Sequence, residues 1–139
     1  TGNIGNEKIY AIKPLTFMNN SGICIRELIE YFKIEAEDVI VFHDDLDIDF
    51  GKIKTKFGGS SAGHNGIESI DKFIGKEYSR VRIGIGLPKN NNEVADHVLQ
   101  DFNDEEKEEI GLITKNITES LPILLDKKLD LFSSTVNNK

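Results

Sequence analysis

The chain has 139 residues, of which 38% are apolar and 29% charged, with one cysteine and a formal net charge of −7. This length and composition fit one globular domain and exclude a disordered chain, and no apolar run approaches the roughly 18–20 residues of a membrane-spanning helix. A single cysteine excludes an internal disulfide, so we expect a soluble protein of the reducing cytoplasm.

The first half of the chain predicts two strands around one helix. Pro14 ends a loosely alternating run, because the residue before a proline is held extended. The run Val39-Ile40-Val41-Phe42 is rich in β-branched residues, so we expect a strand buried on both faces. Between them, apolar residues recur at helical spacing. The predicted elements are a strand at 8–13, a helix at 20–33 and a strand at 38–42.

In the second half, the glycine-rich segment Gly58–Gly66 separates a strand with lysines on its outer face from an amphipathic helix. Asn103 caps a later long helix that Pro122 kinks or ends. The predicted elements are strands at 52–57 and 81–85 and helices at 67–74, 93–100, from 103 onward and 129–136. This order predicts an α/β fold, a single domain over residues 1–139 with a mixed central β-sheet and helices on both faces.

Charge is segregated along the chain. Residues 50–89 hold eight basic and three acidic side chains, a balance of +5, whereas residues 93–139 hold five basic and eleven acidic ones, a balance of −6. The net charge argues mildly against a general nucleic-acid binder. A basic patch on an acidic protein can still hold a phosphate backbone.

Three polar turns carry the side chains best suited to catalysis: Phe17-Met18-Asn19, His43-Asp44 and Gly63-His64-Asn65. If they converge, the amides would hold a carbonyl and its developing oxyanion while an acid orients a base. A glycine segment that opens a helix also presents free backbone N–H groups to a polar ligand. The glycine segment could equally be an ordinary connection, and the acidic turn could simply be solvated.

Other chemistries find less support. The chain has no G-x-x-x-x-G-K-[ST] phosphate loop and no nucleophile elbow for a serine triad. A metal site at His43-Asp44-Asp45-Leu46-Asp47 is disfavoured, because three acids on one turn rarely converge on one ion. We therefore expect neither a metal nor a cofactor.

Four motifs follow one another along the chain: Pro14-Leu15-Thr16-Phe17-Met18-Asn19-Asn20-Ser21-Gly22, His43-Asp44-Asp45-Leu46-Asp47, Gly63-His64-Asn65-Gly66 and Arg82-Ile83-Gly84-Ile85-Gly86. In order and spacing they resemble the bacterial peptidyl-tRNA hydrolase family, over nearly the whole chain. The resemblance implies hydrolysis of the ester between a peptide, or an N-blocked aminoacyl group, and the 3′ end of tRNA. It also implies an α/β fold and a cytoplasmic monomer that needs no metal.

The resemblance assigns roles by position. Asp44 matches the carboxylate that orients the catalytic histidine, and Asn19 and Asn65 match the amides that hold the substrate and the attacking water. Phe17 lines the pocket for the tRNA terminus, and His64 has a supporting role. The residues that match those holding tRNA phosphates are Lys54, Lys56 and Arg82, and Arg80 is a further candidate.

One departure from the family concerns its catalytic base, a histidine in an N-terminal T-R-H-N-type motif. None of His43, His64 and His97 stands in such a context. We therefore expect the chain to be the C-terminal three quarters of the family's domain, poorly stable and inactive alone. Two alternatives remain: a non-catalytic relative that binds RNA or protein, as in intron splicing, and a peptide-binding scaffold without an RNA partner.

Overall fold

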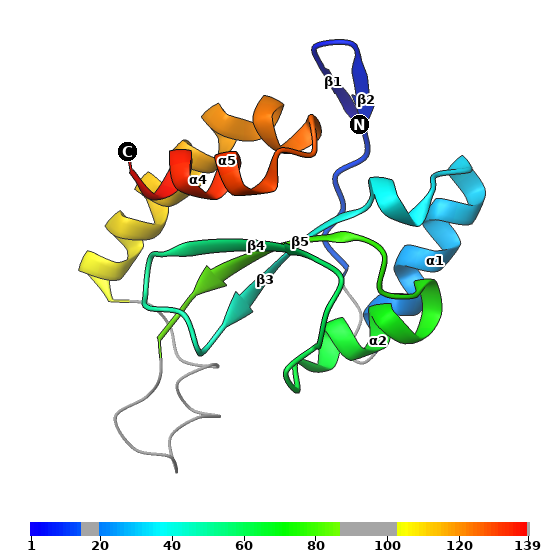
Figure 1. Ribbon diagram of the computed structural model, residues 1–139, viewed down its shortest axis with the longest axis horizontal. Helices are drawn as coiled ribbons and strands as arrows, with labels where there is room; N and C mark the ends of the chain where they lie inside the picture. Colours follow the sequence, from blue (N-terminus) through cyan, green and yellow to red (C-terminus); the bar gives the residue numbers. More distant parts are fainter. Residues whose placement is uncertain (15–19, 87–102, 139) are drawn as a thin grey trace. The chain divides into compact units, whose positions relative to one another are not determined.

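The computed structural model describes residues 1–14, 20–86 and 103–138 (Figure 1). Phe17, Asn19 and the helix predicted at 93–100 therefore lie outside the described residues. The elements are β1 (Gly2–Ile4), β2 (Glu7–Ile9), α1 (Ser21–Phe32), the 3-10 helix η2 (Ala36–Asp38), β3 (Ile40–Asp45), β4 (Ile53–Phe57), α2 (Asn65–Ile74), β5 (Ser79–Gly84), α4 (Asp104–Leu125) and α5 (Leu129–Asn137).

Strands β3, β5 and β4 form a three-stranded sheet in that order. The Ser79 N–H donates to the Val39 carbonyl, and the Ile85 N–H donates to the Asp45 carbonyl. Strand β5 therefore runs parallel to β3. On the other side, Gly58 donates to Tyr78 and Gly84 donates to Lys52, so β4 runs antiparallel to β5. The sheet is therefore mixed, and the predicted α/β class is confirmed.

The chain divides into two compact units. Unit 1 contains residues 1–41 and 56–80, and unit 2 contains residues 42–55 and 81–139. Each unit is described separately below.

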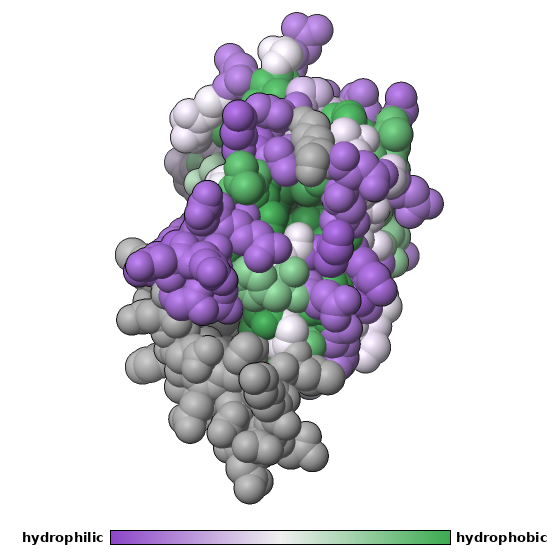
Figure 2. Space-filling model, turned by 90° about the vertical axis from the view of Figure 1, so that its left-hand side faces the viewer, coloured by the Kyte–Doolittle hydropathy of each residue, from purple (hydrophilic) through white to green (hydrophobic). Residues whose placement is uncertain are grey.

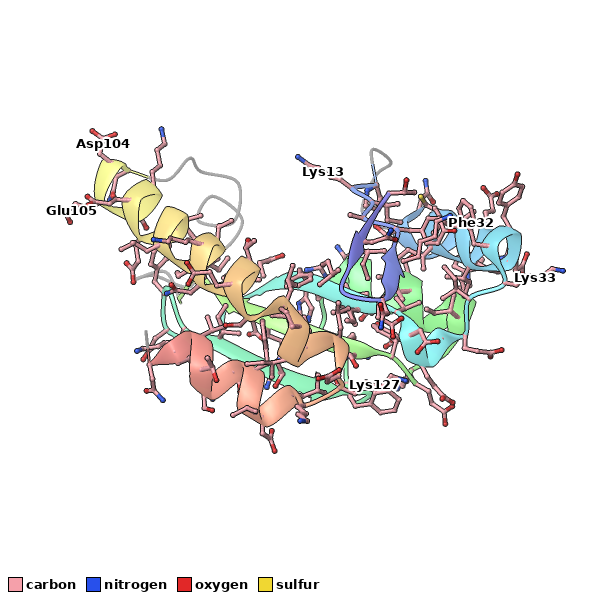
Figure 3. All side chains as sticks on the ribbon, turned by 90° about the horizontal axis from the view of Figure 1, so that it is seen from above. Lys13, Phe32, Lys33, Asp104, Glu105 and Lys127 are labelled. Carbon is pink, nitrogen blue, oxygen red and sulfur yellow. The ribbon has the colours of Figure 1, made fainter. Side chains whose placement is uncertain are left out.

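In unit 1, helices α1 and α2 pack together around a small apolar core of Ile25, Ile67, Ile70 and Tyr78 (Figure 1). The Gly22 N–H donates to the Ser69 hydroxyl at 2.9 Å. At the far end of α1, Phe32 stacks on Tyr10 with ring centroids 4.0 Å apart, and Lys33 ends the helix in the left-handed conformation (Figure 3). The α1–α2 contact thus fixes where α2 begins relative to α1.

In unit 2, α4 and α5 lie side by side, joined at Lys127 (Figures 1 and 3). Asn103 and Glu106 form a reciprocal capping box, with Asp104 and Glu105 in the first turn (Figure 3). Helix α5 is tied to β4, because Thr55 donates to the Leu129 carbonyl and Asn137 bonds the backbone of Ile53. Hydrophilic side chains make up most of the described surface on the face that Figure 2 shows.

The structure corrects four predicted elements. The strand predicted at 8–13 ends at Ile9, because it is one arm of the β1–β2 hairpin that turns at Gly5. Helix α2 begins at Asn65 rather than Ile67, because His64 caps it. Helix α4 continues through Pro122 to Leu125.

The fourth correction concerns β3, which was predicted to be buried on both faces. No residue of β3 is buried, and Phe42 is 43% exposed. In the described sheet β3 is an edge strand with β5 as its single neighbour, so its apolar run is only partly covered.

Candidate active site

The candidate site in unit 1 is the start of helix α2, where the glycine-rich segment delivers His64 and Asn65. The segment reaches α2 through two left-handed residues, Ala62 at φ +49° and Gly63 at φ +82°. The His64 N–H closes this turn on the Ser61 carbonyl at 3.0 Å. His64 then adopts an extended backbone as N-cap, and Asn65 is the first, exposed residue of the helix.

The capping contact fixes the chemistry of the His64 ring. Its Nδ1 accepts a hydrogen bond from the Ile67 N–H at 3.2 Å. A nitrogen that accepts carries no proton, so the neutral ring holds its proton on Nε2. The His64 Nε2–H is therefore a donor group at the start of a helix whose N-terminal N–H groups favour negative charge.

A buried arginine holds the segment that leads to this pair. The Arg80 side chain is 0% exposed; its Nη1 donates to the Ser60 carbonyl at 2.9 Å and its Nη2 to the Gly59 carbonyl at 3.1 Å. Nη2 also donates to Asp71 on α2 at 2.9 Å. The interpretation of Arg80 as a phosphate ligand is therefore wrong, because its guanidinium is enclosed and bonded within the protein.

Tyr78 shares this network, because its hydroxyl donates to the same Asp71 oxygen at 2.8 Å. Burial raises the pKa of Tyr78 well above its ordinary value, and the hydrogen bond to Asp71 raises it further, against the opposing charge of Arg80. Lys56, predicted to bind phosphate, donates from Nζ to the Ser60 carbonyl at 2.9 Å. Ser60 thus accepts from two cations at once.

The candidate site residues in unit 2 are Asp44, Arg82 and Lys54. Asp44 lies partly buried on β3, and the Nδ1 of His43 donates to its backbone carbonyl at 2.8 Å. Arg82 on β5 pairs with the next carboxylate, Asp45, at 3.5 Å between Nη1 and Oδ2. Lys54 is exposed on β4.

Sequence reasoning missed Asp45, which neutralises and orients Arg82. The available signal was strand alternation: successive side chains point to opposite faces, so Asp44 and Asp45 separate into two roles. The same alternation keeps the two carboxylates from chelating one ion. Within residues 1–14, 20–86 and 103–138, no group of three or more His, Cys, Asp or Glu side chains is placed to hold a metal.

The structure therefore brings together His64 and Asn65 in unit 1 and Arg82 and Asp45 in unit 2. Lys56 belongs to unit 1, whereas Asp44 and Lys54 belong to unit 2. No helix in the described part of the chain is long and apolar enough to cross a membrane.

Comparison with known proteins identifies the family. A sequence model described as "Peptidyl-tRNA hydrolase" matches residues 1–139. The chain belongs to the peptidyl-tRNA hydrolase family. The resemblance that the four motifs carry is thus confirmed, and peptidyl-tRNA hydrolysis is the function of this family.

Individual relatives agree. The chain is 77% identical over 139 residues to the peptidyl-tRNA hydrolase of Pelagibacter ubique, covering all of this chain and 75% of the relative. It is 48% identical over 118 residues to that of Aliarcobacter butzleri, covering 85% of this chain and 64% of the relative. A crystal structure of a mutant peptidyl-tRNA hydrolase from Acinetobacter baumannii superposes with a TM-score of 0.89 at 30% identity, covering 98% of this chain and 69% of that one. The chain thus spans about two thirds to three quarters of the relatives it matches.

Proposed function

We propose that the protein hydrolyses the ester that joins a peptide, or an N-blocked aminoacyl group, to the 3′ end of tRNA. The observation that carries this proposal is the 77% identity to the Pelagibacter peptidyl-tRNA hydrolase over all 139 residues, the span that contains the four motifs. Translation supplies the substrate, so we place the protein in the cytoplasm, and we propose that it acts as a monomer without a metal.

In the proposed reaction, water attacks the ester carbonyl while a base takes its proton. The amides of Asn65 and Asn19 hold the carbonyl and the water, and His64 adds its Nε2–H as a donor to the developing oxyanion. The tetrahedral intermediate then breaks the bond to the ribose. The 3′ oxygen leaves with a proton, which releases a free peptide acid and a tRNA. Asp44 orients the base, Phe17 contacts the tRNA terminus, and the phosphate ligands are Lys54, Lys56 and Arg82.

The base itself is proposed to come from outside the described histidines. The His64 Nδ1 is occupied by the helix cap, and the Nε2 of its neutral ring carries the proton. The His43 Nδ1 donates to a carbonyl, and its Nε2 is buried. Neither ring offers an exposed lone pair to water, so we propose that the 139-residue chain alone has little or no activity.

The test compares two preparations with an N-blocked aminoacyl-tRNA as substrate. One is this chain, and the other is this chain joined to the segment of the Pelagibacter relative that it does not cover. We expect hydrolysis only in the second. Hydrolysis by the 139-residue chain would contradict the proposal that this chain alone does not supply the catalytic base. Binding without hydrolysis by the extended protein would favour the non-catalytic relative.

In the active preparation, Asp44→Ala separates chemistry from binding. We expect kcat to fall by about 100-fold or more with tRNA affinity changed less than about threefold, because an orienting carboxylate acts on the base and not on phosphates. Asp47→Ala removes an exposed carboxylate three residues further on and serves as the control. Equal losses of turnover and affinity in Asp44→Ala would remove Asp44 from this role.

A further inference from the structure

The segment from Gly59 to Asn65 carries the proposed donors, yet no residue of it is buried. Burial of apolar side chains therefore does not hold it. Its glycines also give the unfolded backbone more conformations than other residues would, so ordering the segment costs more conformational entropy. The packing of α2 holds the pair from the helix side. The segment that leads to the pair has no such packing, so polar contacts must hold it.

Arg80 makes such contacts on both sides of the pair. Before the pair, its guanidinium binds the carbonyls of Gly59 and Ser60 at 3.1 and 2.9 Å. After the pair, it binds the Asp71 carboxylate on α2 at 2.9 Å. One rigid, fully buried group thus joins the entrance of the glycine-rich segment to the helix that the segment opens.

We propose that Arg80 is a positioning residue, whose guanidinium clamps Gly59 and Ser60 to Asp71 and so sets the places of the His64 ring and the Asn65 amide. This inference rests on the proposed function for its consequence in catalysis, but the clamp is observable without any reaction. The planar fork of arginine suits three acceptors in fixed directions, whereas a lysine ammonium is a single point charge on a flexible stem.

Tyr78 supplies the matched control. Its hydroxyl bonds the same Asp71 oxygen at 2.8 Å but touches neither Gly59 nor Ser60 through any hydrogen bond described. Tyr78→Phe therefore weakens the same buried network and leaves the three bonds of Arg80 in place. Comparison of Arg80→Met and Arg80→Lys with Tyr78→Phe therefore distinguishes a loss of positioning from a loss of stability.

The experiment follows the amide and imidazole signals of the 139-residue chain by ¹⁵N NMR. In the unchanged chain and in Tyr78→Phe, we expect the His64 nitrogens to show an accepting Nδ1 and a protonated Nε2. In Arg80→Met, we expect this signature to be lost, and hydrogen exchange at Ile67 to rise at least about tenfold more than in Tyr78→Phe. Arg80→Lys should fall between them. Equal changes in Arg80→Met and Tyr78→Phe, or an unchanged His64 signature in Arg80→Met, would overturn the proposal.

Arg80→Met could also fail to fold, so the unchanged chain provides a second readout. Clamped Nη protons exchange slowly and do not average by rotation, whereas rapid exchange and free rotation of the guanidinium would overturn the clamp. In the active preparation, we expect Arg80→Lys to lower kcat by about tenfold to a hundredfold with little change in KM, since misplacement of about 1 Å has such effects. If no preparation hydrolyses the substrate, the proposed function fails, and the NMR comparison still decides the clamp.

Discussion

The backbone N–H of Gly22 donates to the Ser69 hydroxyl at 2.9 Å, and a methyl group on Gly22 would overlap the Ser69 carbonyl. Helices α1 and α2 can therefore approach this closely only with glycine at position 22. The contact lies in the first turn of α1, three residues after Asn19 in sequence, and in the helix that Asn65 opens. A side chain at position 22 would therefore push α1 away from α2 and change the distance between the first turns of the two helices.

We expect Gly22→Ala to lower the free energy of unfolding by about 1–3 kcal/mol, as overpacking does in well-packed cores. Gly111→Ala is the control, because Gly111 lies in α4 with nothing within 4 Å of the added carbon. That change should be neutral or stabilising by up to about 1 kcal/mol, since alanine favours helix. Urea unfolding followed by circular dichroism measures both. A Gly22→Ala chain as stable as its Gly111→Ala counterpart would show that the helices separate without cost.

The sequence predicts His64 and Asn65 at the start of a helix, because a glycine-rich segment precedes apolar residues that recur at helical spacing. Sequence reasoning did not foresee His64 as the cap, since the usual capping side chains are Ser, Thr, Asp and Asn. It also read Arg80 as a surface cation, because arginine is rarely buried without a partner. The partner, Asp71, is nine residues away with no local pattern to join them. Tertiary contacts of this kind produce no periodic pattern in the sequence, so they cannot be predicted from it.

Tyr78 gives the stability a dependence on alkaline pH. Its pKa is raised in the folded chain by burial, so the unfolded chain loses this proton first as the pH rises. The contribution of Tyr78 is complete below the ordinary tyrosine pKa of about 10 and declines above it by about 1.4 kcal/mol per pH unit. We expect the unfolding free energy of the unchanged chain to fall more steeply between pH 10 and pH 11 than that of Tyr78→Phe. Parallel curves would contradict a raised pKa.

Asn137 completes the backbone pairing of β4 from the end of α5. Its Nδ2 donates to the Ile53 carbonyl at 2.8 Å, and its Oδ1 accepts from the Ile53 N–H at 2.9 Å. Ile53 is 0% exposed, so Asn137→Ala leaves buried backbone groups unpaired. We expect a loss of about 1–3 kcal/mol in unfolding free energy, against almost none for the exposed neighbour in Asn138→Ala. Similar losses in the two variants would mean that water replaces the amide.

Lys54 tests the phosphate patch separately from the loop. It is exposed on β4, whereas Lys56 on the same strand face is engaged with the Ser60 carbonyl. We therefore expect Lys54→Ala to weaken tRNA binding and to make the slope of log K against log salt less negative by about 0.7–0.9, the share of one phosphate contact. Lys107→Ala, on helix α4, removes the same charge from an exposed residue that is not one of the proposed phosphate ligands, and it should leave the slope unchanged. A slope that shifts equally in both variants would reflect net charge alone, and Lys54 would then not contact a phosphate.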